Sequence, residues 1–62
     1  MKTTVTLADS MDLVVTGLQV ILHRQTNVEI SGTFQALTPL LDALAAQRPD
    51  VILLDDRLGP AL

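Results

Sequence analysis

A short stretch near the C-terminal end decides the fold class: Arg48-Pro49-Asp50-Val51-Ile52-Leu53-Leu54-Asp55. Its centre, residues 51–54, is a run of four apolar side chains bounded by turn-forming and acidic residues, which is typical of a short strand. A strand that is apolar on both sides belongs to a parallel sheet that helices cover on both faces. The stretch therefore predicts an α/β fold, with this strand buried inside the sheet.

The chain before this stretch alternates strand and helix patterns. Residues 3–8 are rich in β-branched side chains and predict a first strand. Residues 28–34 begin with alternating apolar and polar side chains and predict a second, more exposed strand. Between the two strands, apolar residues recur three and four positions apart from 11 to 24. That period predicts an amphipathic helix, with Asp9 and Ser10 as cap residues.

A second helix is predicted before the third strand. Thr38 is a good cap residue and Pro39 suits the first helical position, while Arg48 and Pro49 close the helix. The element order is then β-α-β-α-β. Crossovers between parallel strands are right-handed, and we expect the first strand in the middle of the sheet, with the strand order 2-1-3.

The composition leaves part of this apolar surface without cover. The chain has 62 residues, of which 48% are hydrophobic, and it has no Cys. Disulfides and thiolate metal sites, which stabilise many small domains, are therefore excluded. A chain of this size buries only about 60% of its unfolded surface. We expect the remaining cover to come from self-association or from the rest of a larger domain.

Charge and hydropathy exclude two classes of partner. The net charge is −3, and the four basic side chains, Lys2, Arg24, Arg48 and Arg57, are scattered. Phosphate backbones need clustered cations, so we expect no direct nucleic-acid binding by this segment. Strictly apolar runs reach only four residues, so no membrane span is expected. The N-terminus lacks the apolar core of a signal peptide, and we expect a cytoplasmic protein.

Two acidic residues follow the outer ends of predicted strands. Ligands of an open parallel sheet bind beyond the carboxyl ends of its strands. Asp9 ends the first strand and Asp55 ends the third, so neighbouring strands would bring their carboxylates face to face. Oxygen ligands in this arrangement suit Mg²⁺. The alternative is structural: Asp9 caps the helix and Asp55 forms a turn.

The chain resembles the first half of a response-regulator receiver domain, especially in regulators of the LuxR/NarL type. Residues 48–55 are similar to the family's Arg-Pro-Asp-Val-Val-Leu-Leu-Asp, whose last Asp accepts a phosphoryl group. Residues 5–10 resemble the first strand and its acidic end, residues 13–18 the first helix, and residues 28–32 the second strand. The resemblance implies a flavodoxin-like doubly wound sheet, of which residues 1–62 form a partial domain.

The resemblance also implies roles for three residues. Asp55 would take a phosphoryl group from a sensor histidine kinase, which makes the chain a phosphoacceptor and not an enzyme. Asp9 and Asp55 would hold Mg²⁺ together with the backbone carbonyl of Arg57, whose side chain is not implicated. Phosphorylation would control transcription in a longer parent protein.

Three departures from the family pattern leave several interpretations open. Ser10 stands where the family has a second acid, which should weaken Mg²⁺ binding, and Leu58-Gly59-Pro60 replaces a Met-Pro-Gly turn. The fourth and fifth strands, with their switch hydroxyl and Lys, are absent from the 62 residues. The chain is then a piece of a longer regulator, a homo-oligomer formed through the edge at residues 51–54, or a degenerate receiver that binds a partner without phosphorylation.

Overall fold

The structure, a computed structural model, describes residues 2–55, 57 and 58 and contains three strands and two helices. In chain order the elements are β1 (Thr3–Ala8), α1 (Asp12–His23), β2 (Val28–Phe34), α2 (Leu37–Ala46) and β3 (Val51–Leu54). The strands are parallel and lie in the order β2-β1-β3. The α/β class, the β-α-β-α-β order and the 2-1-3 strand order are therefore confirmed.

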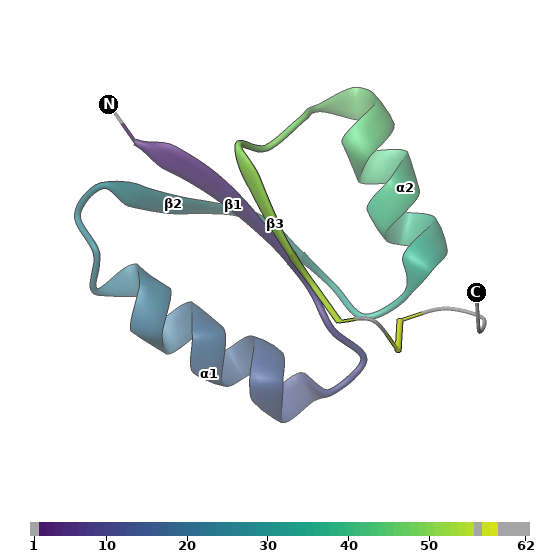
Figure 1. Cartoon of the computed structure of the whole chain (residues 1–62), viewed down its shortest axis with the longest axis horizontal. Helices are drawn as coiled ribbons and strands as arrows, with labels where there is room; N and C mark the ends of the chain where they lie inside the picture. Colours follow the sequence, from purple (N-terminus) through teal and green to yellow (C-terminus); the bar gives the residue numbers. More distant parts are fainter. Residues whose placement is uncertain (1, 56, 59–62) are drawn as a thin grey trace.

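The two helices lie on opposite sides of the sheet (Figure 1). This follows from right-handed crossovers in opposite directions: the first steps from β1 to β2, and the second returns from β2 past β1 to β3. Ala8 packs in one cluster with Leu40 of α2 and with Leu58. Because side chains alternate along a strand, Val5 and Leu7 face the α1 side, and both are buried. β1 is thus covered on both faces and forms the centre of the fold.

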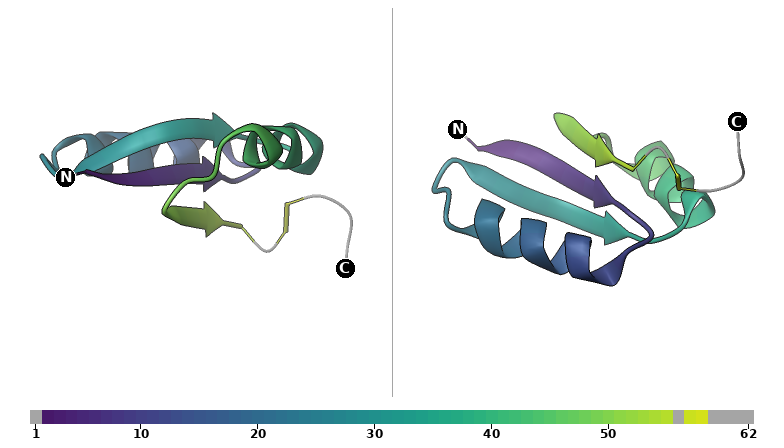
Figure 2. Two further views of the ribbon diagram at one scale, coloured as in Figure 1. Left: turned by 90° about the horizontal axis from the view of Figure 1, so that it is seen from above. Right: turned by 60° about the horizontal axis from the view of Figure 1, so that its bottom comes forward.

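β3 is far more exposed than its sequence predicts. Its four side chains retain between 40% and 57% of their accessible surface. The strand pairs with β1 along one side and lies at the edge of the sheet within the described residues (Figure 2). The prediction of a strand buried on both faces is therefore wrong for this structure. Residues 51–54 instead present exposed apolar surface, at the edge where one interpretation of the sequence has a homo-oligomer form.

The start of α1 differs by one residue from the prediction. Met11 occupies the N-cap position and makes no side-chain cap, and the helix begins at Asp12. The Asp9 carboxylate accepts a hydrogen bond from the backbone N–H of Met11 at 2.8 Å, so it shapes the turn that leads into the helix. Ser10 is exposed and does not hold the cap position.

The predicted start and end of α2 were also wrong, by two residues each. Ala36 is the N-cap residue, so Thr38 and Pro39 lie inside the first turn. A proline is tolerated there because the first four N–H groups of a helix have no partner within it. The helix ends at Ala46, before Arg48.

A hydroxyl pair, of which Thr6 is buried, marks an irregularity between β1 and β2. The register shifts between Val5 and Thr6, so that Ser31 is an extra residue on β2. Thr6 is 4% exposed, and its hydroxyl lies 2.8 Å from that of Ser31. The Ser31 hydroxyl also donates to the Val5 carbonyl at 3.4 Å. The bulge thus supplies the partner that a buried hydroxyl requires.

At the amino ends of the strands, Thr4 and Asp50 tie β1 to the start of β3. The Thr4 backbone N–H and hydroxyl donate to one Asp50 carboxylate oxygen at 2.8 and 3.0 Å. The Asp50 backbone N–H lies 2.9 Å from the Thr4 hydroxyl oxygen and 3.0 Å from the Thr4 carbonyl oxygen. The backbone hydrogen bond, aided by the hydroxyl, lowers the pKa of Asp50.

We expect Asp50→Asn to destabilise the chain at neutral pH and to matter less in acid. Because the folded-state pKa of Asp50 is lowered, its contribution is present above the unfolded pKa of about 4 and fades as pH falls through the folded value. Thermal melts followed by circular dichroism from neutral pH down to acid check this. Asp42→Asn, on the exposed side of α2, is the matched control. A wild-type–variant difference that stays constant with pH would contradict the assignment.

Candidate functional site

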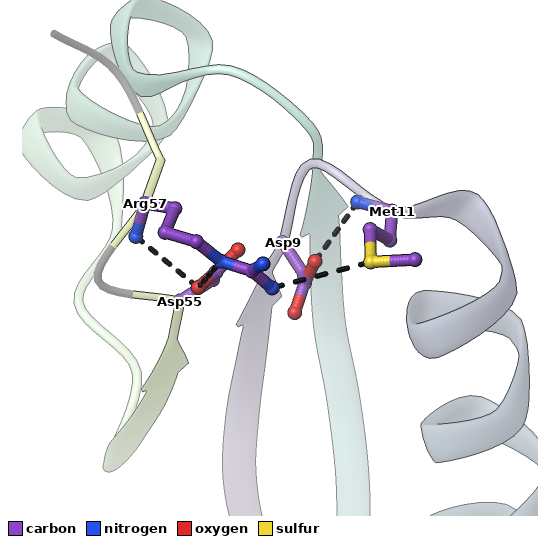
Figure 3. Close-up of polar contacts among 4 residues, drawn as sticks. All are labelled: Asp9, Met11, Asp55 and Arg57. Carbon is purple, nitrogen blue, oxygen red and sulfur yellow. Dashed lines mark hydrogen bonds and ion pairs between the residues drawn. The ribbon is translucent and has the colours of Figure 1, made fainter.

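The carboxyl ends of β1 and β3 bring Asp9 and Asp55 to the same edge of the sheet. Ala8 pairs with Leu54, and the next residue on each strand is one of the two acids. The Asp55 backbone N–H donates to the Ala8 carbonyl at 2.9 Å, which carries the pairing one step beyond β3. Figure 3 shows both side chains at this edge. The predicted neighbourhood of the two acids is therefore present in the structure.

Each of the two carboxylates also shapes its own loop. Asp9 Oδ1 accepts from the Met11 N–H at 2.8 Å, and Asp55 Oδ1 accepts from the Arg57 N–H at 3.1 Å. Both bonds span two residues, as in turns built by Asp and Asn side chains. Asp55 therefore forms a turn, as the structural alternative predicts, and it also lies at the end of β3.

The side chain of Arg57 contacts Asp55, which sequence reasoning did not anticipate. Its Nε lies 3.4 Å from Asp55 Oδ1 and forms an ion pair. The Arg57 side chain is 71% exposed, whereas that of Asp55 is only 8% exposed. The expectation concerned the Arg57 carbonyl as a metal ligand and did not foresee this contact of the side chain. The sequence did contain a signal for this contact. Arg57 lies two residues after Asp55, and a tight turn at that spacing brings the two side chains together.

Leu58 anchors the loop that carries Arg57. It is 6% exposed and packs against Ala8 and Leu40, with Phe34 and Leu44 around them. Its backbone N–H donates to the Asp55 carbonyl at 3.1 Å. From the sequence, Leu58 was expected to be part of a turn. An apolar side chain four positions after a strand can also indicate a buried core residue. Asp56, Gly59 and Pro60, which complete the predicted loop, lie outside the described residues.

The charged side chains at this edge are few. Asp12, in the first turn of α1, accepts a hydrogen bond from the Gln35 side-chain amide at 2.8 Å, which ties it to the loop before α2. Ser10 contributes no charge. Among the described residues, Asp9, Asp12, Asp55 and Arg57 therefore carry a formal net charge of −2 at this edge.

The donor set suits a hydrated Mg²⁺ better than a fully protein-bound ion. Mg²⁺ takes one or two carboxylates and keeps several waters, and Asp9, Asp55 and the Arg57 carbonyl offer oxygens of that kind. Within residues 2–55, 57 and 58, no group of three or more His, Asp or Glu side chains is placed to hold a metal. A cation at this edge would therefore take the two carboxylates that follow paired strand positions and keep water as its other ligands.

A broad open groove lies elsewhere in the molecule, between α1 and β2. Lys2, His23, Arg24 and Glu29 are among the residues that line it, and neither of the paired acids does. The two paired acids therefore lie outside this groove.

Comparison of the chain with protein-family models, with curated proteins and with solved structures finds no match. Neither helix in the described part of the chain is long and apolar enough to cross a membrane.

Proposed function

We propose that the chain is a receiver-like segment of a two-component response regulator, with Asp55 as the phosphoacceptor. The observation that carries the proposal is the pairing of β1 with β3, which sets Asp55 beside Asp9. The resemblance of residues 48–55 to the receiver motif supports the same assignment. In a longer regulator the phosphorylated segment would act in the cytoplasm and control transcription.

The chemistry is transfer of a phosphoryl group from a histidine of the sensor kinase. A carboxylate oxygen of Asp55 forms a bond to phosphorus, the phosphorus–nitrogen bond breaks, and its electron pair stays on the imidazole nitrogen. The product is an acyl phosphate. Mg²⁺ bound by Asp9, Asp55 and the Arg57 carbonyl would offset the negative charge of the transferring group. Since the Asp55 side chain is 8% exposed, its attacking oxygen has little competing hydration.

The direct test uses acetyl phosphate as the donor. The Asp55 oxygen attacks phosphorus and acetate leaves, so the intact protein gains one phosphoryl group in mass. We expect labelling in Mg²⁺ and none after chelation with EDTA, and hydroxylamine should remove the label because it cleaves acyl phosphates. Absence of label at saturating Mg²⁺ would contradict the proposal.

A second candidate function is self-association, with or without phosphorylation. The exposed apolar surface of β3 favours it, because apolar edge strands invite pairing with another chain. Hydrogen bonds alternate in direction along a parallel strand. Since the Asp55 N–H points to β1, the backbone groups of Ile52 and Leu54 point away from it. Two copies paired along this edge would form one continuous sheet of six strands.

We expect Ile52→Lys to convert such a dimer to a monomer. A lysine on an edge strand keeps its charge in water and opposes strand addition, and Ile52 is already 40% exposed. Sedimentation velocity at micromolar concentration measures the change, and circular dichroism checks that the fold remains. Ile21→Lys on α1, where Ile21 is 58% exposed, is the matched control and should stay dimeric. A wild-type chain that sediments as a folded monomer would remove this candidate.

A further inference from the structure

The Arg57 side chain bridges the two loops that follow β1 and β3. Its Nε approaches Asp55 Oδ1 at 3.4 Å, and its Nη2 donates to the sulfur of Met11 at 4.0 Å (Figure 3). Met11 in turn donates its backbone N–H to Asp9. The guanidinium thus extends from the loop of one acid to the loop of the other.

The Arg57 side of this contact is open to solvent. The Arg57 side chain is 71% exposed although that of Asp55 is only 8% exposed, so the guanidinium stays largely hydrated while it contacts the carboxylate. The fold does not depend on this contact, because Leu58 packs the loop against Ala8 and Leu40. The guanidinium can therefore leave Asp55 while the loop stays in place.

A divalent cation at the same oxygens would meet this positive charge. Mg²⁺ needs the oxygens of Asp9 and Asp55, while the guanidinium of Arg57 already neutralises one of the two charges. Like charges a few ångströms apart repel even at high effective dielectric. Ser10 brings no further carboxylate to offset the repulsion.

We propose that the Arg57 side chain is a built-in counter-ion that competes with Mg²⁺ for Asp55. The residue then acts in two opposite ways: its carbonyl supports the metal and its guanidinium opposes it. This inference rests on the proposed function, since it describes how the phosphoacceptor edge is regulated. At low Mg²⁺ the guanidinium holds Asp55, and rising Mg²⁺ displaces it and opens the edge to phosphoryl transfer.

The test compares Mg²⁺ affinities by titrating the ¹⁵N-labelled chain and following backbone amide shifts. Arg57→Met keeps the carbonyl and an unbranched apolar side chain but removes the guanidinium charge, and we expect it to bind Mg²⁺ about tenfold more tightly. Arg24→Met removes the same charge from the C-terminal end of α1. That position lies roughly 18 Å along the helix from its start, beyond the Debye length of about 10 Å, so we expect less than a twofold change.

A second readout follows the contact itself. The Arg57 Nε–H resonance should shift when Mg²⁺ is added to the wild type, and it should shift in Asp55→Asn without Mg²⁺. Equal affinities of wild type and Arg57→Met, with Mg²⁺-dependent labelling intact, would overturn the counter-ion role alone. Absence of Mg²⁺ binding in both chains would overturn the proposed phosphoacceptor function and the competition together.

Discussion

Asp55→Asn is expected to reduce labelling by acetyl phosphate to background. The amide that replaces the carboxylate has no anionic oxygen to attack phosphorus. Its carbonyl oxygen can still accept the Arg57 N–H that Asp55 Oδ1 now accepts, so the loop should keep its shape. Intact-mass spectrometry of the reacted chain measures the loss, and amide spectra check the fold.

Two companion variants separate the acceptor from its neighbours. Asp9→Asn should lower labelling at limiting Mg²⁺, and labelling should return to the wild-type level at high Mg²⁺. The reason is that Asp9 is proposed to hold the metal and not the phosphoryl group. Asp42→Asn, which removes an exposed carboxylate from α2, should label like the wild type. Undiminished labelling of Asp55→Asn would mean that the acceptor is another residue.

Leu7→Ala is expected to lower the melting temperature of the chain by about 10 °C or more. Leu7 lies on the central strand, is 1% exposed and is the largest fully buried side chain among the described residues. Replacing a buried leucine by alanine costs about 2–5 kcal/mol. A domain of this size is marginally stable, and natural domains in general have only about 5–15 kcal/mol in total. The measurement is a thermal melt by circular dichroism.

Leu13→Ala is the matched control for this prediction. Leu13 lies on α1 with 80% of its surface exposed, so the same chemical change should alter stability by no more than about 0.5 kcal/mol. If Leu7→Ala and Leu13→Ala melt together, the core is not centred on β1 as the structure has it.

The prediction of the secondary structure was most accurate where the signal is local. The first strand at residues 3–8 coincides with β1, because its β-branched side chains favour the extended backbone by themselves. The start of α2 was predicted too late because Thr38 and Pro39 are local start signals. The structure begins this helix at Leu37, which packs against the cluster of Ala8, Leu40 and Leu58. Packing outweighed the local preference there.

The candidate site was predictable only in part. Asp9 and Asp55 could be placed together because each directly follows a predicted strand, and parallel strands end at the same edge. The contacts of Arg57 could not be placed, because they depend on the direction that the chain takes after β3. Leu58 sets that direction through its burial against Ala8.

The sequence by itself determined the α/β class, the element order and the strand order of this protein. Hydrophobic periodicity acts over a few residues, and the right-handedness of crossovers limits how successive strands can be arranged in one sheet. Only the tertiary structure decided that β3 is exposed and that the Arg57 side chain reaches from Asp55 to Met11. Arg57 and Met11 are 46 positions apart in the chain. Burial and ion pairing depend on which distant segments meet. Only the folded backbone sets the distances in space between such segments.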